Sequence, residues 1–351
     1  MTAASLPPTM PAAVYAGDGV VEVHDIPVPA LHEQGAIVEV SHCGICGTDL
    51  HFVLERMGRK GAVFGHEWAG TVVALGPNAQ TDVALGATVV AADRPGCGHC
   101  RACRAGRPSV CVERATPNFF GGTGAFTRYK HVDASSLLPL PAGVSLRDAA
   151  LTEPLAVAMH ARTLSGAQPG DRVLVTGAGP VGTLMVAVLK AAGVDDITVS
   201  EPAPRRRERA AALGATVVTP DALPRAPMGR PVDEPFTIAF ECSGRAAAAE
   251  AALDQLDRAG MFVFLGTGSD APKVNHNRVI ILEQTLIGSY NYDEQGFRNA
   301  LELIASGRLP LDLLIEPDDV PLDQVGRAME QLGAGELAAK ALVVPRVGGR
   351  P

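Results

Sequence analysis

The chain has 351 residues, and at about 150 residues per domain this length suggests two domains. Its 30 Lys and Arg residues and 38 Asp and Glu residues give a formal net charge of −8, which argues against nucleic acid and anionic membranes as partners. The hydrophobic content of 47% with only 4% aromatic residues indicates a globular protein with a core of Ala, Val and Leu. The longest uncharged run, residues 173–189, is shorter than the roughly 20 apolar residues of a membrane span. Residues 1–9 lack the features of a signal peptide, so we expect a cytoplasmic protein.

The N-terminal part of the chain is predicted to be rich in β-strands. Short Val-rich runs separated by Gly, Pro, Asn and Asp predict strands at residues 20–28, 35–40, 70–75 and 87–91. Residues 91–124 differ, because they are dense in Gly, Cys, Arg and Pro and show little periodicity. Such a segment has no core of its own and needs another source of stability.

Strands and helices alternate from residue 150 onward. Helices are predicted at residues 150–164, 182–192, 205–213 and 246–258, and strands at 172–176, 197–201, 217–219, 237–242, 261–266 and 285–288. This alternation indicates an α/β fold with a doubly wound parallel sheet. An amphipathic helix at 295–307 and a strand at 340–344 complete the chain.

Six of the seven cysteines lie between positions 43 and 111, and four of them form one cluster. Cys97, Cys100, Cys103 and Cys111 have the spacing C-x2-C-x2-C-x7-C, which lets four thiolates converge on one tetrahedral ion. A zinc ion with four protein ligands has no open position, so it would be structural. A pair of disulfides, free thiols or an iron–sulfur cluster are the alternatives.

A second set of metal-ligating residue types is spread along the chain. Cys46 begins the segment Cys-Gly-Thr-Asp-Leu-His, which also holds Thr48, Asp49 and His51. Gly65-His66-Glu67 follows about twenty residues later, and Glu153 begins a Glu-Pro-Leu segment. A thiol, an imidazole and a carboxylate together with water match the ligand set of a catalytic zinc.

A glycine-rich loop follows the predicted strand at 172–176. Gly177-Ala178-Gly179-Pro180-Val181-Gly182 has the G-x-G-x-x-G pattern in its required strand–turn–helix context, which predicts a dinucleotide site. Glu201 ends the next strand, where its carboxylate can accept from both ribose hydroxyls and would repel a 2′-phosphate, so we expect NAD. One of Arg205, Arg206 and Arg207 could neutralise such a phosphate and admit NADP, or all three could form a solvated helix face.

Together these motifs resemble the zinc-dependent medium-chain alcohol dehydrogenases, most closely the polyol branch of sorbitol, butanediol and threonine dehydrogenases. The resemblance runs from about residue 10 to residue 344. It implies a GroES-like catalytic domain at residues 1–150 and 291–351, with a zinc lobe at 91–124. It also implies a Rossmann NAD-binding domain at 151–290 and assembly into homodimers or homotetramers.

The resemblance also implies roles for single residues. Cys46, His66 and Glu153 match the catalytic zinc ligands, and Glu67 matches a ligand or an exchanging one. Thr48 matches the hydroxyl that takes the substrate proton, and His51 the end of the relay to solvent. Asp49 would orient His66. The two remaining thiols, Cys43 and Cys242, are predicted to be core residues.

The expected activity is hydride transfer between a secondary alcohol or polyol and NAD, with two zinc ions per chain. An NADP-dependent carbonyl reductase of the same fold is one alternative, and a zinc-stabilised dinucleotide-binding protein without turnover is another. We expect the substrate, a small alcohol or ketone, to contact residues 52–62 and the segment Asn118-Phe119-Phe120, although Phe119 and Phe120 could instead be core residues. The segment Tyr290-Asn291-Tyr292 could face the substrate or a subunit interface.

Overall fold

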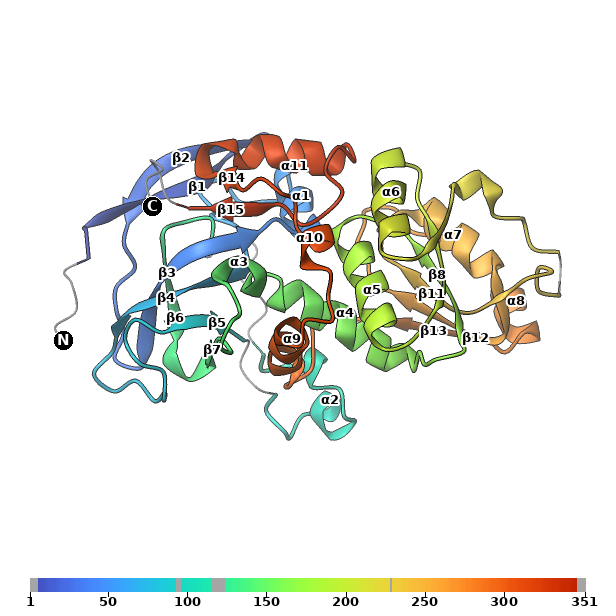
Figure 1. Ribbon diagram of the computed structural model, residues 1–351, viewed down its shortest axis with the longest axis horizontal. Coiled ribbons are helices and arrows are strands. Elements are labelled where there is room, and N and C mark those ends of the chain that lie inside the picture. The colour runs from blue at the N-terminus through green and yellow to red at the C-terminus, as the bar shows by residue number, and fades with distance from the viewer. Residues whose placement is uncertain (1–5, 93–95, 115–123, 228, 346–351) are drawn as a thin grey trace.

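A computed structural model describes residues 6–92, 96–114, 124–227 and 229–345. Figure 1 shows two halves side by side, each built around its own sheet, with the C-terminal elements returning to the N-terminal half. The segment Asn118-Phe119-Phe120 lies outside the described residues.

The N-terminal half contains a mixed sheet in which seven strands are described. Their order is β14-β15-β3-β4-β5-β7, and β6 pairs with the free part of β3. A separate hairpin of β1 and β2 packs beside this sheet. The strands are β1 (Thr9–Gly17), β2 (Val20–Pro27), β3 (Gly35–Gly44), β4 (Glu67–Leu75), β5 (Thr88–Ala91), β6 (Tyr129–Asp133), β7 (Leu137–Pro139), β14 (Val320–Pro321) and β15 (Leu342–Val344).

The C-terminal strand joins the mixed sheet through antiparallel pairing with β3. Leu342 pairs with Gly44 and Val343 with Cys43, so residues near 340 lie against residues near 45. The Ile45 N–H donates to the carbonyl of Ala341 at 3.0 Å. Almost 300 residues of chain therefore separate two segments that lie in direct contact.

The C-terminal half is built on a six-stranded parallel sheet. Its order, β10-β9-β8-β11-β12-β13, reverses direction beside β8. In doubly wound sheets, ligands bind at such a reversal, outside the carboxyl ends of the strands. The strands are β8 (Arg172–Thr176), β9 (Asp196–Ser200), β10 (Thr216–Val218), β11 (Phe236–Glu241), β12 (Leu256–Phe264) and β13 (Thr285–Gly288).

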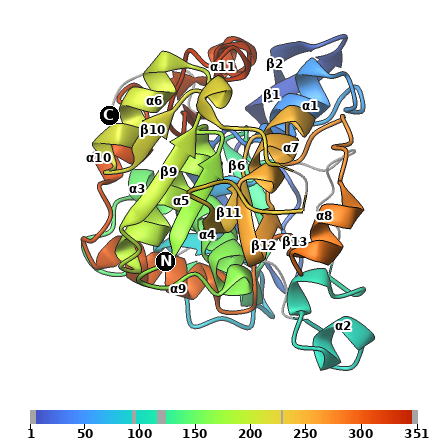
Figure 2. The ribbon, with the colours of Figure 1, turned by 90° about the vertical axis from the view of Figure 1, so that its right-hand side faces the viewer.

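Helices cover both faces of the parallel sheet (Figure 2). They are α5 (Pro180–Ala191), α6 (Pro204–Ala212), α7 (Ala246–Asp254) and α8 (His276–Ile281). Val173, Leu174 and Val175 of β8 are fully buried, as expected for a strand covered on both sides. The predicted α/β architecture is confirmed.

The sequence prediction was wrong at the end of α7. The predicted helix 246–258 stops at Asp254, and β12 begins at Leu256. Leu256 is fully buried and pairs with Phe236 of β11, so sheet pairing outweighs the helical preference of this segment.

Helix α4 (Thr152–Ser165) lies between the two halves and packs on α5 and on α9 (Gly296–Ala305). It ends at Gly166, whose φ of 70° is the left-handed conformation that glycine favours at a helix C-terminus. The remaining helices are α1 (Gly47–Leu54), α2 (Arg101–Arg104), α3 (Leu146–Ala149), α10 (Leu311–Leu314) and α11 (Val325–Gly333). Within the described ranges, none of the helices combines the length and apolarity needed to cross a bilayer.

Candidate functional site

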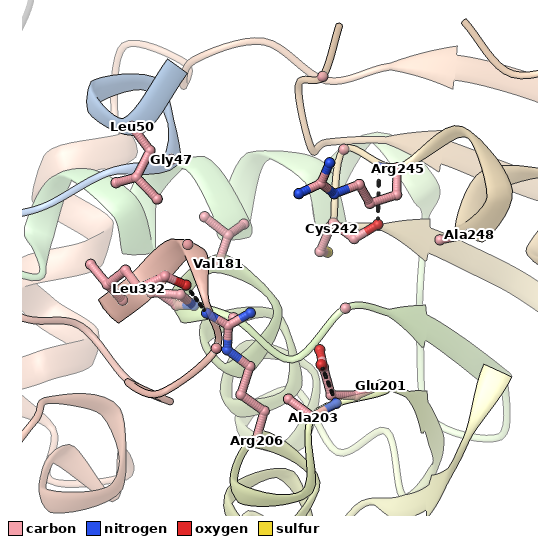
Figure 3. A pocket seen from close by; sticks show the side chains of 18 of the residues that line it. Gly47, Leu50, Val181, Glu201, Ala203, Arg206, Cys242, Arg245, Ala248 and Leu332 are labelled. Carbon is pink, nitrogen blue, oxygen red and sulfur yellow. Dashed lines mark hydrogen bonds between the residues drawn. The ribbon is translucent and has the colours of Figure 1, made fainter. Parts of the chain in front are cut away.

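A cavity of about 850 Å³ lies where the two halves meet. One wall carries the carboxyl ends of the parallel strands and the glycine-rich loop, and the other carries α1 and the end of α11. Figure 3 shows side chains from both walls pointing into this space, among them Leu50 and Val181. The cavity therefore joins the predicted dinucleotide site to Cys46, one of the predicted metal ligands.

Two glycines of the glycine-rich loop, Gly177 and Gly182, leave no room for a side chain. Gly177 has a φ of 88°, and a Cβ there would lie 2.8 Å from the Ser243 side chain. A Cβ on Gly182 would lie 2.0 Å from the carbonyl oxygen of Gly177, so Gly182 permits close helix–strand packing. Gly179 is the N-cap of α5, and Pro180 begins the helix. Gly177, Gly179, Pro180 and Val181 line the cavity, whereas Gly182 lies behind them.

Glu201 lies directly after β9 and also lines the cavity. Its carboxylate accepts from the Ala178 N–H at 2.7 Å and from the Ala203 N–H at 2.9 Å. Glu201 therefore fixes the glycine-rich loop. Each carboxylate oxygen has a second lone pair, which can accept a ligand hydroxyl.

Of the three arginines of α6 that the sequence left open, Arg205 is exposed and lies 3.7 Å from Glu316, whereas Arg206 and Arg207 are partly buried and donate to backbone carbonyls. Arg206 Nη2 donates to the carbonyl of Leu332 at 2.6 Å, and Nε donates to the carbonyl of Leu337 at 3.1 Å (Figure 3). Arg207 donates to the carbonyls of Glu201 and Pro202. Arg206 therefore ties the parallel-sheet half to the segment that follows α11.

Three of the predicted metal ligands lie together. Single ligand atoms of Cys46, His66 and Glu67 lie within 4.8 Å of one another. Burial alone would lower the pKa of His66, but the negative charges of Cys46, Asp49 and Glu153 raise that pKa well above its usual value. This concentration of negative charge fits a divalent cation.

Asp49 organises the two segments that carry these ligands. It is 1% exposed and accepts from the Cys46 N–H at 2.9 Å and the Gly65 N–H at 3.3 Å. Its Oδ1 lies 3.7 Å from Nδ1 of His66. These contacts agree with the predicted role of orienting His66.

Glu67 forms a buried ion pair that the sequence analysis did not predict. Lys340 Nζ lies 2.7 Å from both carboxylate oxygens of Glu67, with hydrogen-bond geometry to Oε1 only. Nζ also donates to the Ile45 carbonyl at 3.1 Å. Burial would lower the pKa of Lys340, but Glu67, Cys46 and Glu153 more than compensate, and that pKa is raised. A Cβ on Gly44 would lie 2.2 Å from Glu67 Oε2, so glycine leaves room for this pair.

Glu153 lies in the first turn of α4 and is partly buried. Its charge acts on both His66 and Lys340, which places it beside the same cluster. Four candidate ligands thus come from α1, β4 and α4 and the residues adjoining them.

Thr48 and His51 lie on α1 beside the cluster. Thr48 Oγ1 is 3.7 Å from Cys46 Sγ. His51 reaches across to the other half of the molecule, where its Nε2 lies 2.9 Å from the carbonyl oxygen of Thr267. Its Nδ1 lies 2.8 Å from Oε1 of Glu55, one helical turn further along.

The four cysteines of the lobe form a second cluster, with all four sulfur atoms within 4.8 Å of one another. Backbone N–H groups of Cys97, Cys100 and Cys103 donate to cluster sulfurs at 3.3 to 3.4 Å. Such bonds from the backbone lower the pKa of Cys100 to about 6. All seven cysteines are free thiols, which disfavours the disulfide alternative.

Several predictions outside these clusters need adjustment. Cys43 is fully buried, as predicted, but Cys242 is only partly buried and lines the cavity. Within residues 52–62, Leu54 and Glu55 line the cavity, whereas Phe52 and Val53 pack in the core of the N-terminal half.

The segment at 290–292 serves packing. Tyr292 is 5% exposed, and its ring lies 4.8 Å from that of Phe297. Arg114 of the cysteine lobe donates to the Tyr292 carbonyl at 2.8 Å. Tyr292 therefore helps to hold the lobe against the start of α9, and Tyr290 is 46% exposed.

Two cavity residues were missed by sequence reasoning. Lys340 stood in an apolar run that read only as a strand, and Arg245 follows β11 without any motif. Figure 3 shows Arg245 at the cavity wall, next to Cys242. Arg245 follows the carboxyl end of β11 and Lys340 precedes β15, and neither position carried a motif in the sequence.

Comparison with known proteins agrees with this architecture. Residues 32–142 match the family described as alcohol dehydrogenase GroES-like domain, and residues 180–306 match zinc-binding dehydrogenase. The chain is 34% identical to 2-dehydro-3-deoxy-L-galactonate 5-dehydrogenase of Pseudoalteromonas atlantica, over 95% of this chain and 98% of the relative. It is 31% identical to sorbitol dehydrogenase of Bacillus subtilis, over 93% and 94%. The crystal structure of L-idonate 5-dehydrogenase from Escherichia coli superposes with a TM-score of 0.82 at 28% identity, over 96% and 98%.

Proposed function

Because this chain belongs to the zinc-dependent medium-chain alcohol dehydrogenases, in their polyol branch, we propose that it transfers a hydride between a secondary alcohol or polyol and NAD. The observation that carries this proposal is the single cavity, which has the glycine-rich loop on one wall and Cys46 on the other. Such an arrangement lets one chain hold the cofactor and the reacting alcohol within the same space.

Cys46, His66 and Glu153 are proposed to hold the catalytic zinc. When bound, the ion supplies a Lewis acid for the alcohol oxygen. The ion pair with Lys340 supports Glu153 over Glu67 as the third ligand, because it already neutralises the Glu67 carboxylate. Cys97, Cys100, Cys103 and Cys111 would hold the structural zinc, which makes two ions per chain.

Thr48 and His51 are proposed to carry the substrate proton. Thr48 lies beside Cys46 and accepts the proton at its hydroxyl oxygen. His51 lies one turn further along α1, where the cavity wall continues toward its mouth. Asp49 keeps the start of this helix in register with His66.

NAD is favoured over NADP by the two residues that a ribose would meet. Glu201 presents a carboxylate to the cavity, and a 2′-phosphate would be repelled by it. Arg206 lines the same region but is engaged by the Leu332 and Leu337 carbonyls. A 2′-phosphate would have to break these contacts to gain a cation.

A homo-oligomer is proposed to form at the β13 edge of the parallel sheet. β13 is the last strand in the described sheet, so its outer edge has no partner strand there. The preceding helix α8 exposes Ile280 at 67% and Ile281 at 57%. Apolar side chains beside an open edge are a frequent feature of subunit contacts.

A cytoplasmic location remains a prediction from the sequence.

The test is NADH formation, followed by absorbance at 340 nm, with zinc-loaded protein and a panel of sugar alcohols, aldonic acids, diols and amino alcohols. We expect oxidation of at least one polyhydroxylated substrate, with a larger kcat/KM for NAD than for NADP. The relatives named above, which act on sorbitol, L-idonate and a deoxygalactonate, support this choice of panel. Failure to oxidise any of these alcohols, or to reduce the matching ketones with NADH, would contradict the proposal.

A further inference from the structure

Glu55 occupies an unusual place in the cavity wall. It is the C-cap of α1, one turn beyond His51, and it lines the cavity while its side chain remains 38% exposed. Its Oε1 lies 2.8 Å from Nδ1 of His51. Glu55 therefore contacts the proposed relay on one side and solvent on the other.

The two contacts of His51 are both made with hydrogen-bond acceptors. Nδ1 faces the Glu55 carboxylate, and Nε2 faces the carbonyl oxygen of Thr267. Both contacts are hydrogen bonds only when both ring nitrogens carry a proton. A backbone carbonyl cannot take that proton away, whereas a carboxylate can.

The two contacts also differ in permanence. Thr267 belongs to the loop after β12, in the other half of the molecule, and the next residues, Gly268 and Ser269, line the cavity, so a ligand entering the cavity can displace Thr267 from Nε2. Glu55 is four residues from His51 on the same helix, and this spacing keeps the two side chains adjacent. Nδ1 is thus the ring nitrogen that keeps its contact when a ligand enters, and Glu55 connects it to solvent.

We propose that Glu55 is the exit of the proton relay, a positioning residue that orients His51 and accepts its proton. This inference rests on the proposed function. In alcohol oxidation, the C–H bond gives a hydride to the nicotinamide, the O–H bond gives a proton, and a C=O bond forms. His51 starts this step neutral, with its proton on Nδ1 facing Glu55. The substrate proton passes through Thr48 to Nε2, the Nδ1 proton leaves for Glu55 Oε1 and passes to water, and proton exchange with water returns His51 to its starting tautomer. Glu55 ends the turnover as the carboxylate it was before, and no electrons move on it.

The test compares Glu55→Gln with wild type in zinc-loaded protein. Glutamine keeps the size and an acceptor oxygen but does not take up a proton. In dilute buffer we expect kcat to fall about tenfold, less than the roughly 10²–10⁴-fold effect of a group at the reacting atoms. An added buffer that does not coordinate zinc, such as MES, should restore kcat toward the wild-type value, because a diffusing base replaces the lost carboxylate.

Two controls separate this role from a structural one. NADH affinity from fluorescence titration and zinc content should be unchanged in Glu55→Gln. Glu22→Gln removes a comparable exposed partner from His24, at 2.9 Å on β2, and should show no buffer dependence. An unchanged kcat, or a loss that buffer does not restore, would overturn the proposal. Absence of activity in wild type would instead contradict the proposed function.

Discussion

The two cysteine-containing clusters differ in how the chain assembles them. The four lobe cysteines come from 15 consecutive residues, and short local turns bring their sulfurs together. The second cluster takes Cys46 from the residue before α1 and His66 and Glu67 from the start of β4, and the charge of Glu153 on α4 acts on His66. The first site is closed by its own loop, whereas the second opens into the cavity between the halves. A local site can support stability, and a site assembled from distant segments can face a substrate.

The largest effect on the difference between the two clusters is expected from Cys46→Ser. We expect kcat/KM to fall about 10⁴-fold, which corresponds to about 5.5 kcal/mol, because the open site loses its soft ligand. Elemental analysis should find one zinc per chain, against the two that we expect in wild type. Circular dichroism should show an unchanged fold. Normal turnover in this variant would remove Cys46 from the site.

Lys340→Met tests the buried charge behind the open site. Removing the lysine leaves the Glu67 carboxylate buried and unpaired, which is expected to cost about 3–5 kcal/mol. The measurement is urea unfolding of the zinc-loaded protein. The double variant Lys340→Met with Glu67→Leu should recover most of this loss, because it removes both charges. If the double variant is no more stable than the single one, the ion pair is not the cause.

Cys103→Ser addresses the closed site. We expect the loss of one zinc and a fall in unfolding free energy of about 3 kcal/mol, the value for a ligand present at roughly a hundredfold excess over its Kd. Activity at low temperature should persist, because Cys103 does not line the cavity. A loss of activity as large as that of Cys46→Ser would show that the two sites are not separate.

His160→Leu gives the smallest effect and concerns the contact between the lobe and α4. His160 is 6% exposed, its two ring nitrogens have no hydrogen-bond partner among the described residues, and burial lowers its pKa. A lowered pKa means that the unfolded state binds the proton first. The free energy that neutral His160 contributes to folding is therefore present above about pH 6.5 and is lost as the pH falls below that value. Between pH 6.5 and pH 5, wild type should lose more unfolding free energy than His160→Leu, as measured by thermal unfolding at a series of pH values. Equal losses of unfolding free energy in wild type and in His160→Leu would show that His160 is not the source of this pH dependence.

Much of the fold could be predicted because its signals are local. The strand at 172–176, the glycine-rich loop and the strand at 285–288 were placed at the bounds that the structure shows. The end of α7 was misplaced because the pairing of Leu256 with Phe236 depends on a neighbouring strand. The candidate ligands were found from residue types and spacing, but the partner of Glu67 was not, because 273 residues separate it from Lys340.

The seven cysteines show where local information ends. By itself, the sequence determined the cysteine cluster of the lobe, the glycine-rich loop and the strand–helix alternation, since each depends on residues close together in the chain. Only the tertiary structure decided that Cys242 lines the cavity, that Arg206 holds the segment after α11, and that Lys340 neutralises Glu67. The contact between Lys340 and Glu67 arises where the C-terminal segment returns to the N-terminal sheet, because the pairing of β15 with β3 brings the two residues together.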